Sequence, residues 1–510
     1  MRITNDLVQS RFDKLARLKA LGVAPYAYAA RVSHRPAGIQ ADPEPLIAAA
    51  TPVEVAGRLV ALRGHGKTSF GVIRDQGADL QLYFRKDDLG DQAYGLLEHL
   101  DLGDWIAARG TVFRTKTGEV TVAAQGFSLL AKALLPPPAK WHGLKDVETR
   151  YRQRYADLIG NEAVRRAFIL RTRIVSAVRR FLDERDYLEV ETPVLQPMYG
   201  GAFARPFTSH HHALGVPLYL RISDELYLKR LIVGGLDRVY EIGKDFRNEG
   251  IDKNHNPEFT MLEFYEAYAD YQGMMRTIEE LLTAVRTAIG LPATTRWREC
   301  EIDWTPPFAR TTYFGALSDA AGFDVTQASE SRLRERVQAV AVEVAGPALG
   351  LVLAPGVPRD AYYEALFGAL VEPKLIRPTF VLDYPREISP LAKQKRDDPN
   401  VVERFELYVA GMELANAFSE QNDPLAQEEA MRGQEERRQK GDEEAQAFDH
   451  DYVRALMYGM PPTGGLGMGI DRLTMLFSGA ESIRDVILFP LLKPEPADVA
   501  LDAEVAGPEP

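Results

Sequence analysis

Short runs of alternating apolar and polar residues fill the segment from Val53 to Leu130. The clearest of these runs are 55–60, 69–73, 80–84 and 120–122, and glycine-containing turns separate them. Side chains of a strand point alternately to its two faces, so each run would bury one face and expose the other. The segment is therefore predicted to form a small β-barrel.

A longer spacing of apolar residues begins after this segment. Residues 161–185 carry apolar side chains at helical spacing, and residues 187–193 then turn extended and end at Pro193. Further strands are predicted at 219–222, 239–242, 259–265, 379–382 and 405–409, with helices between them. The pattern indicates an α+β domain, in which helices flank an antiparallel sheet.

The same patterns divide the chain. Pro136, Pro137 and Pro138 lack backbone donors and stiffen the chain, which is typical of a linker. The predicted organisation is an amphipathic helix and lead-in over 1–52, the barrel over 53–135, a linker over 136–160, the second domain over 161–493 and a disordered acidic tail over 494–510.

Composition narrows the class of protein. A chain of 510 residues, 45% of them hydrophobic, has enough apolar material for more than one core. The single cysteine, Cys300, excludes a disulfide framework and favours a cytoplasmic location. No segment is apolar and long enough for a membrane span, and a net charge of −12 argues against nonspecific binding of nucleic acid.

Two segments far apart in the chain carry groups suited to a nucleotide. One is Phe246-Arg247-Asn248-Glu249, followed by His255 and Phe259, and the other runs from Gly465 to Arg472 with glycine at every second position up to Gly469. Attack of a carboxylate on the α-phosphate of ATP needs positioning and charge neutralisation rather than covalent help. Arg247 and Arg472 are the predicted catalytic residues, because a guanidinium can hold phosphate and carboxylate oxygens together.

The pair of segments resembles motifs 2 and 3 of the class II aminoacyl-tRNA synthetases. The stretch from Gly411 to Asp423 narrows the resemblance to the lysyl enzymes of bacterial type, and 151–155 and 483–490 match as well. The resemblance implies a five-stranded OB-fold barrel before a class II catalytic domain. Residues 161–193 resemble motif 1, which implies a homodimer, although Asp186 stands where many members have Gly. Asp471 likewise replaces the Glu of many motif 3 sequences.

The resemblance also implies the ligands of the nucleotide site. The expected ATP-binding residues are Arg247, Glu249, His255, Phe259, Glu406 and Arg472. Glu406 and Glu413 match the family's Mg²⁺ positions, and carboxylates on a hairpin are suitable ligands for a hard cation that accompanies ATP.

An acidic, aromatic-walled pocket is predicted beside the nucleotide. Strand periodicity places Glu263 with Tyr265 on one face, and Asn416, Phe418 and Glu420 on another. A buried ammonium demands such carboxylates. The resemblance implies an L-lysine pocket with Glu263, Tyr265 and Glu420 around the ε-ammonium, Phe418 along the methylene stem, and Asn416 with Arg247 at the carboxylate. It places Glu225 and the Gly201 backbone at the α-amino group.

On the barrel, the residues that match anticodon-contacting positions are Arg63, Phe70, Gln81 and Glu119. Phe70 taken alone would more often be a core residue. Together with these residues, the resemblance implies ATP-dependent activation of L-lysine and its transfer to tRNA(Lys). Two alternatives are a relative that attaches lysine-like groups to proteins, which would lack the barrel, and a regulatory protein that would have lost the arginines and glutamates of the site.

Overall fold

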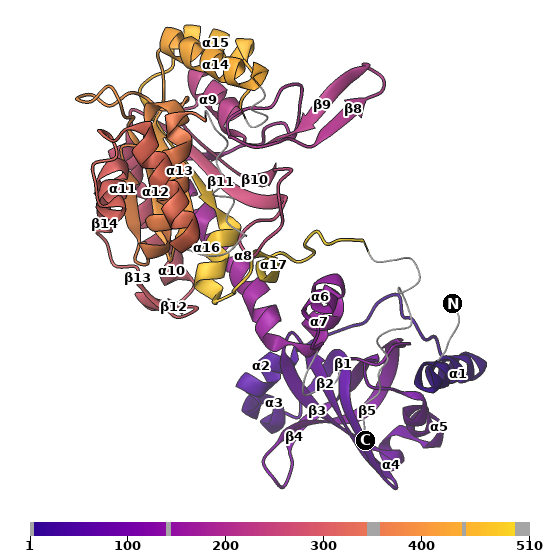
Figure 1. Cartoon of the computed structure of the whole chain (residues 1–510). Helices are drawn as coiled ribbons and strands as arrows, with labels where there is room; N and C mark the ends of the chain where they lie inside the picture. Colours follow the sequence, from indigo (N-terminus) through magenta and orange to yellow (C-terminus); the bar gives the residue numbers. More distant parts are fainter. Residues whose placement is uncertain (1–4, 139–143, 344–356, 441–444, 495–510) are drawn as a thin grey trace. The chain divides into compact units, whose positions relative to one another are not determined.

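The structure is a computed structural model that describes residues 5–138, 144–343, 357–440 and 445–494 (Figure 1). The chain forms two compact units, residues 1–162 with 492–510 and residues 163–491. Among the described residues, no helix is long and apolar enough to cross a membrane.

The N-terminal unit is built on a closed five-stranded barrel with the strand order β1-β2-β3-β5-β4. Its strands are β1 (Pro52–His65), β2 (Thr68–Asp75), β3 (Ala78–Arg85), β4 (Trp105–Arg114) and β5 (Val120–Ala131). Strands β3 and β5 pair in parallel and the other neighbours pair antiparallel. Every second residue of β1 from Val53 to Leu59 is buried, as the alternation predicted. The five-stranded barrel is confirmed.

Short helices surround this barrel. They are α1 (Asp6–Ala20), α2 (Pro36–Ala41), α3 (Glu44–Ala48), α4 (Lys86–Leu89), α5 (Asp91–Gly95), η1 (Leu96–His99), α6 (Val147–Arg152) and α7 (Arg154–Gly160). Helix α1 has the amphipathic character predicted for the N-terminal segment, and its Leu18 lies in the barrel core. Helices α6 and α7 occupy part of the segment 136–160, for which the sequence predicted a linker.

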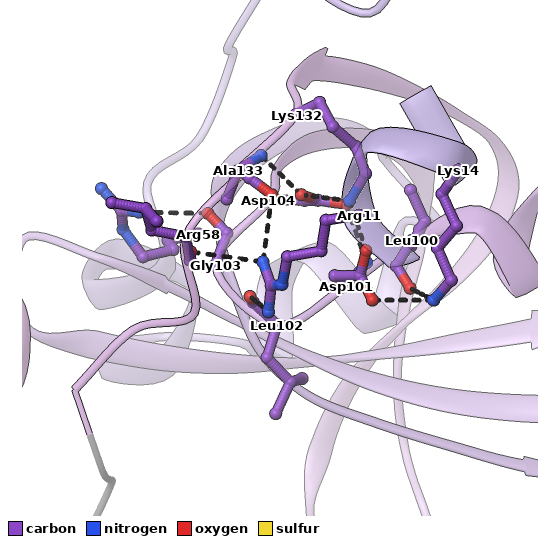
Figure 2. Close-up of polar contacts among 11 residues, drawn as sticks. Arg11, Lys14, Arg58, Leu100, Asp101, Leu102, Gly103, Asp104, Lys132 and Ala133 are labelled. Carbon is purple, nitrogen blue, oxygen red and sulfur yellow. Dashed lines mark hydrogen bonds and ion pairs between the residues drawn. The ribbon is translucent and has the colours of Figure 1, made fainter. Parts of the chain in front are cut away.

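A buried polar network holds α1 against the barrel (Figure 2). Lys132 and Asp104 are both fully buried, and the Lys132 ammonium lies 3.0 Å from Asp104 and 2.6 Å from Asp101. From α1, Lys14 reaches Asp101 at 2.7 Å, and Arg11 donates to the backbone oxygens of Leu102 and Ala133. The network satisfies charges that would be costly to bury alone.

The second unit is built on an eight-stranded sheet with the order β14-β15-β16-β17-β18-β11-β10-β6. The strands of this unit are β6 (Leu188–Glu189), β7 (Leu195–Gln196), β8 (Thr208–His211), β9 (Val216–Leu220), β10 (Arg238–Phe246), β11 (Glu258–Ala267), β12 (Thr294–Trp297), β13 (Cys300–Asp303), β14 (Ala309–Thr312), β15 (Thr379–Leu382), β16 (Arg404–Val409), β17 (Met412–Ser419) and β18 (Thr463–Gly469). The predicted antiparallel pairing holds for the central strands, whereas both edge pairs, β14 with β15 and β6 with β10, are parallel.

Helices cover this sheet. They are α8 (Glu162–Asp183), α9 (Glu225–Val233), α10 (Tyr271–Ala288), α11 (Tyr313–Ala321), α12 (Glu330–Glu343), α13 (Arg359–Leu370), η2 (Glu372–Lys374), η3 (Arg386–Ile388), α14 (Pro424–Gln439), α15 (His450–Met457), α16 (Ile470–Ser478) and α17 (Ile483–Val486). The largest core joins α8, α10 and α16 to the sheet, through side chains such as Phe181, Ile278 and Leu473. After α8, Asp186 adopts a left-handed backbone with φ of 61°. A glycine would adopt this conformation freely, and Asp tolerates it better than most residues.

Candidate functional site

A cavity of about 330 Å³ opens on the face of the central strands that lies opposite the main core. It is lined by every residue that the sequence analysis assigned to ATP, lysine or metal: Gly201, Glu225, Arg247, Glu249, His255, Phe259, Glu263, Tyr265, Glu406, Glu413, Asn416, Phe418, Glu420 and Arg472. These residues come from segments more than 200 positions apart, and the sheet brings them together.

Strand alternation explains the floor of the cavity. In β18, Leu466 and Met468 enter the core, so Gly465, Gly467 and Gly469 face the cavity. A Cβ at position 465 would overlap the Glu420 carboxylate and the Tyr265 ring. Glycine at this position is therefore required by the close approach of the two pocket walls.

A β-bulge aims the predicted metal ligands. Strands β16 and β17 pair Glu406 with Asn416 but then pair Tyr408 with Glu413, so one extra residue stands in β17. The bulge shifts the alternation, and Glu413 consequently shares the face of Glu406. Carboxylate oxygens from both strands thus line one end of the cavity, which suits a hard divalent cation.

The two carboxylates have different surroundings. Glu406 is buried and accepts hydrogen bonds from Arg404 at 2.6 Å, Tyr384 at 2.8 Å and Tyr408 at 2.6 Å. Burial, followed by the charge of Glu413, raises its pKa. Burial also acts to raise the pKa of Glu413. The positive charge and the hydrogen bond of Arg472 outweigh burial, so the pKa of Glu413 is lowered. Glu413 therefore stays ionised at neutral pH.

Arg472 joins this end of the cavity to the loop after β10. Its Nη1 donates to the Glu413 backbone oxygen at 2.6 Å and lies 3.1 Å from the Glu413 carboxylate. Its Nη2 lies 3.3 Å from His255 Nε2, and His255 Nδ1 lies 2.8 Å from Asp252. Because a guanidinium has no acceptor, His255 Nε2 accepts from Arg472 in this arrangement, and Asp252 orients the ring through Nδ1.

Arg247 lies on the adjoining wall, beside the exposed Glu249. Its guanidinium carbon lies 5.1 Å from the centre of the Phe259 ring, and its Nε donates to the Ile222 backbone oxygen at 3.4 Å. Among the residues that the structure describes, no carboxylate forms an ion pair with it. Its terminal nitrogens are thus free to bind an anionic ligand in the cavity.

The opposite end of the cavity is acidic. Glu225 and Glu420 are both buried, and the fully buried Lys229 forms ion pairs with both carboxylates. The Lys229 ammonium also lies 5.1 Å from the centre of the Phe418 ring. Glu420 Oε1 receives no hydrogen bond from the described residues, although it is buried. This end of the cavity therefore has more carboxyl groups than ammonium groups, and burial raises the pKa of both Glu225 and Glu420.

Glu263 stands beside this pair. It accepts hydrogen bonds from Tyr265 at 2.6 Å and from Ser223 at 3.2 Å. Burial, with the charges of Glu225 and Asp245, raises the pKa of Glu263 to about 8. A positive charge bound next to Glu263 would reverse that shift.

The backbone at Gly201 closes the cavity nearby. Its φ is +89°, and a Cβ would lie 2.8 Å from Ser223 Oγ, so only glycine fits without strain. The Gly201 amide lies 3.3 Å from Gln446 Oε1.

Several residues that support the cavity side chains were not predicted from the sequence. Lys229 stands one helical turn after Glu225, and Arg404 stands two residues before Glu406 on the same strand face, so spacing could have found both. Nothing in the sequence pointed to Gln446, because it joins the cavity only through the fold. Asp471, noted as a replacement for Glu, accepts from the Thr260 amide at 2.6 Å and from Arg171 at 2.5 Å, and so ties α16 to β11 and α8.

The barrel residues form a separate group on the N-terminal unit. Arg63 of β1 lies opposite Phe70 of β2, and Phe70 packs against Tyr83 of β3 with ring centres 4.9 Å apart. Gln81 donates to Glu119 at 2.9 Å. Phe70 keeps 38% of its surface exposed. It is therefore a surface ring that can stack on a base, rather than the core residue that a lone Phe would more often be.

Comparison with known proteins agrees with this architecture. Residues 146–493 match the family described as tRNA synthetases class II (D, K and N), and residues 53–130 match the OB-fold nucleic acid binding domain. A relative from Carboxydothermus hydrogenoformans, described as a lysine–tRNA ligase, is 50% identical over 96% of this chain and 98% of its own length. Proteins of the same description from Moorella thermoacetica (98% of its own length) and Roseiflexus castenholzii (99%) are also 50% identical, over 96% of this chain. The chain belongs to the class II tRNA synthetases of the D, K and N group.

Proposed function

We propose that the chain activates L-lysine with ATP and transfers it to tRNA(Lys), releasing AMP and pyrophosphate. The observation that carries the proposal is the charge arrangement of one cavity. Glu225, Glu263 and Glu420 make one end acidic, whereas Arg247 and Arg472 bring two guanidinium groups to the other end, beside the Glu406 and Glu413 carboxylates. A substrate with an ammonium at one end and a carboxylate near ATP fits this arrangement.

Arg247 holds the reactants in this proposal. Its terminal nitrogens bind the α-phosphate and the lysine carboxylate together, so that the carboxylate oxygen lies in line for attack. Arg472 and His255 donate to the far phosphates and stabilise the charge of the departing pyrophosphate. Phe259 offers its ring to the adenine, and Glu249 accepts from the adenine amino group.

Glu406 and Glu413 would hold Mg²⁺ bound with ATP. Their carboxylates share one face, and the lowered pKa of Glu413 keeps it ionised, which fits the oxygen ligands that Mg²⁺ prefers. The cation would supply neutralisation of phosphate charge. Arg404 keeps Glu406 in place and also donates to Asn416 at 3.0 Å, which aligns the amide with the lysine carboxylate.

For the amino acid, Glu263, Tyr265 and Glu420 surround the ε-ammonium, and Phe418 packs along the methylene stem. Glu225 and the Gly201 backbone receive the α-amino group. Lys229 forms ion pairs with both Glu225 and Glu420. The proposed site for the α-amino group of lysine therefore adjoins the proposed site for its ε-ammonium. A site that pairs buried carboxylates with the substrate rejects an uncharged analogue by roughly 10⁴-fold.

The barrel contacts the tRNA anticodon in this proposal, through Arg63, Phe70, Gln81 and Glu119. Its presence argues against the alternative of a protein-modifying relative, which would lack it. A homodimer is supported by exposed apolar side chains on α8 and the segment after it, namely Ile169, Leu188, Val194 and Leu195. The single cysteine accords with a cytoplasmic location.

Exchange of labelled pyrophosphate into ATP with each of the twenty amino acids tests the proposal. We expect exchange with lysine, followed by charging of total tRNA with lysine. The Arg247→Ala variant should lose roughly 10²- to 10³-fold or more in exchange with its fold intact, because one positioned donor to the reacting phosphate is gone. Exchange with another amino acid would refute the pocket assignment, and exchange without charging would favour the protein-modifying alternative.

A further inference from the structure

Three carboxylates lie buried together behind the acidic end of the cavity. Oxygen atoms of Asp224, Asp245 and Glu263 all lie within 4.8 Å of one another. Glu263 lines the cavity. Asp224 and Asp245 do not line it, and each residue is only 1% exposed. Three negative charges at this separation in a dry site repel each other strongly.

The nearby cation does not reach all three. Arg221 lies 2.6 Å from Glu241 and 3.2 Å from Asp245, and it also donates to the Thr192 side chain and the Lys244 backbone. The titratable and charged groups that face Asp224 and Glu263 include Arg221 before α9, Glu225 of α9, Glu241 and Asp245 of β10, Tyr265 of β11 and Glu420 after β17. Carboxylates outnumber cations in this set.

Asp224 lies at a helix N-terminus without the capping hydrogen bond that is usual there. It occupies the N-cap position of α9, where an Asp usually accepts a helix amide, but its side chain makes no such bond. Ser223 Oγ accepts from the Glu225 amide instead. Both Asp224 oxygens are buried, and no hydrogen-bond donor of the described residues reaches them.

An Asp224 oxygen lies within 4.8 Å of a Glu263 oxygen. A hydrogen bond between the two carboxyl groups requires a proton on one of them, and such a bond from Asp224 acts to lower the pKa of Glu263. Burial, followed by the charges of Glu263 and Asp245, raises the pKa of Asp224 well above its usual range. The donors separate the two groups, because Glu263 accepts from Ser223 and Tyr265, whereas Asp224 accepts from none of the described residues.

We propose that Asp224 is a positioning residue of the amino-acid pocket that works as a protonated acid and donates a hydrogen bond to the Glu263 carboxylate. This inference rests on the proposed function, because it concerns how Glu263 is held for an ammonium of the substrate. With three donors, Ser223, Asp224 and Tyr265, Glu263 keeps one orientation when it is ionised.

Two substitutions at position 224 separate this role from its alternatives. Asn is neutral and keeps a donor, so Asp224→Asn should leave the lysine KM of pyrophosphate exchange within about three-fold of wild type. Its pH profile should not move. Leu has no donor, so Asp224→Leu should raise the lysine KM about ten-fold or more while the ATP KM stays unchanged. Asp270→Asn is the matched control, because Asp270 caps α10 with both amide bonds made and should alter neither constant.

Several results would overturn the proposal. If Asp224 were an anion, Asp224→Asn would remove a negative charge, weaken lysine binding at least ten-fold and shift the pH profile to lower pH. Equal KM values for Asp224→Leu and wild type would show that the donor is not used. A metal ion that copurifies with wild type and is lost in Asp224→Asn would show that a cation balances the three carboxylates instead.

A spectroscopic measurement tests the proton in the wild-type protein itself. The infrared difference between wild type and Asp224→Asn should contain the C=O band of a protonated carboxyl, and the absence of that band would refute the inference. Failure of the proposed function looks different, because wild type would then show no lysine-dependent exchange at all.

Discussion

For single residues of the cavity, the ionisation state depends on burial and on the charged neighbours together. Glu413 and Glu263 are both glutamates on the cavity wall, yet their pKa values shift in opposite directions. Arg472 stabilises the first as an anion, whereas the neighbours of the second are mostly acidic. Composition alone gives no access to this difference, because it arises from the partners that the fold supplies.

Lysine binding should therefore depend on pH. With a pKa of about 8, Glu263 carries a proton at lower pH, and an ammonium can bind fully only after that proton leaves. Lysine affinity should rise with pH from about 6 to 8, by at most about ten-fold per pH unit, and then level off. Calorimetric titration at several pH values measures this, and ATP titrated in parallel controls for general effects. A flat profile would contradict it.

At the scale of elements, the sequence predicted strands better than their exact pairing. Alternation placed Asn416 and Phe418 of β17 on one face with Glu420, the residue after the strand, and all three line the cavity. The bulge in β17 was not predictable from alternation, since it depends on pairing with β16. The two parallel edge pairs were missed for the same reason, because they join strands distant in the chain.

The buried network of the N-terminal unit allows a test of one element. Lys132→Met would leave Asp104 buried without its cation, which costs about 3–5 kcal/mol. Amide hydrogen exchange of β4 and β5 should accelerate by roughly 10²-fold or more, since Asp104 directly precedes β4 and Lys132 directly follows β5. Lys14→Met is the matched control, because Lys14 is partly exposed and its pairing with Asp101 contributes about 1 kcal/mol or less. Equal exchange in the two variants would contradict the role of Lys132.

At the scale of the whole molecule, the barrel and the larger unit divide the proposed work between them. Both the barrel and the α+β domain could be predicted from the sequence, because alternation and helical spacing are strong signals over long segments. Alternation also grouped some of the cavity residues, such as Glu263 with Tyr265, but their roles were predicted through resemblance to a family. Supporting residues such as Asp224 and Gln446 escaped, because their contacts exist only in three dimensions.

A variant on the barrel tests this division. Phe70→Ala should leave lysine-dependent pyrophosphate exchange unchanged and raise the tRNA KM of charging about ten-fold, because loss of base stacking costs about 1–3 kcal/mol. Tyr28→Ala removes a fully exposed ring of the same unit outside the Phe70 surface and should leave charging unchanged. Unaltered charging by Phe70→Ala would refute the anticodon assignment.

The three glycines of β18 that face the cavity, Gly465, Gly467 and Gly469, limit how this pocket could be redesigned. Positions 465, 467 and 469 have no side chain to remove, and position 465 already lies in contact with both walls. Enlarging the pocket for a bulkier lysine derivative must therefore begin at the walls, with Tyr265 or Phe418. Libraries that vary the glycines would mostly yield blocked sites.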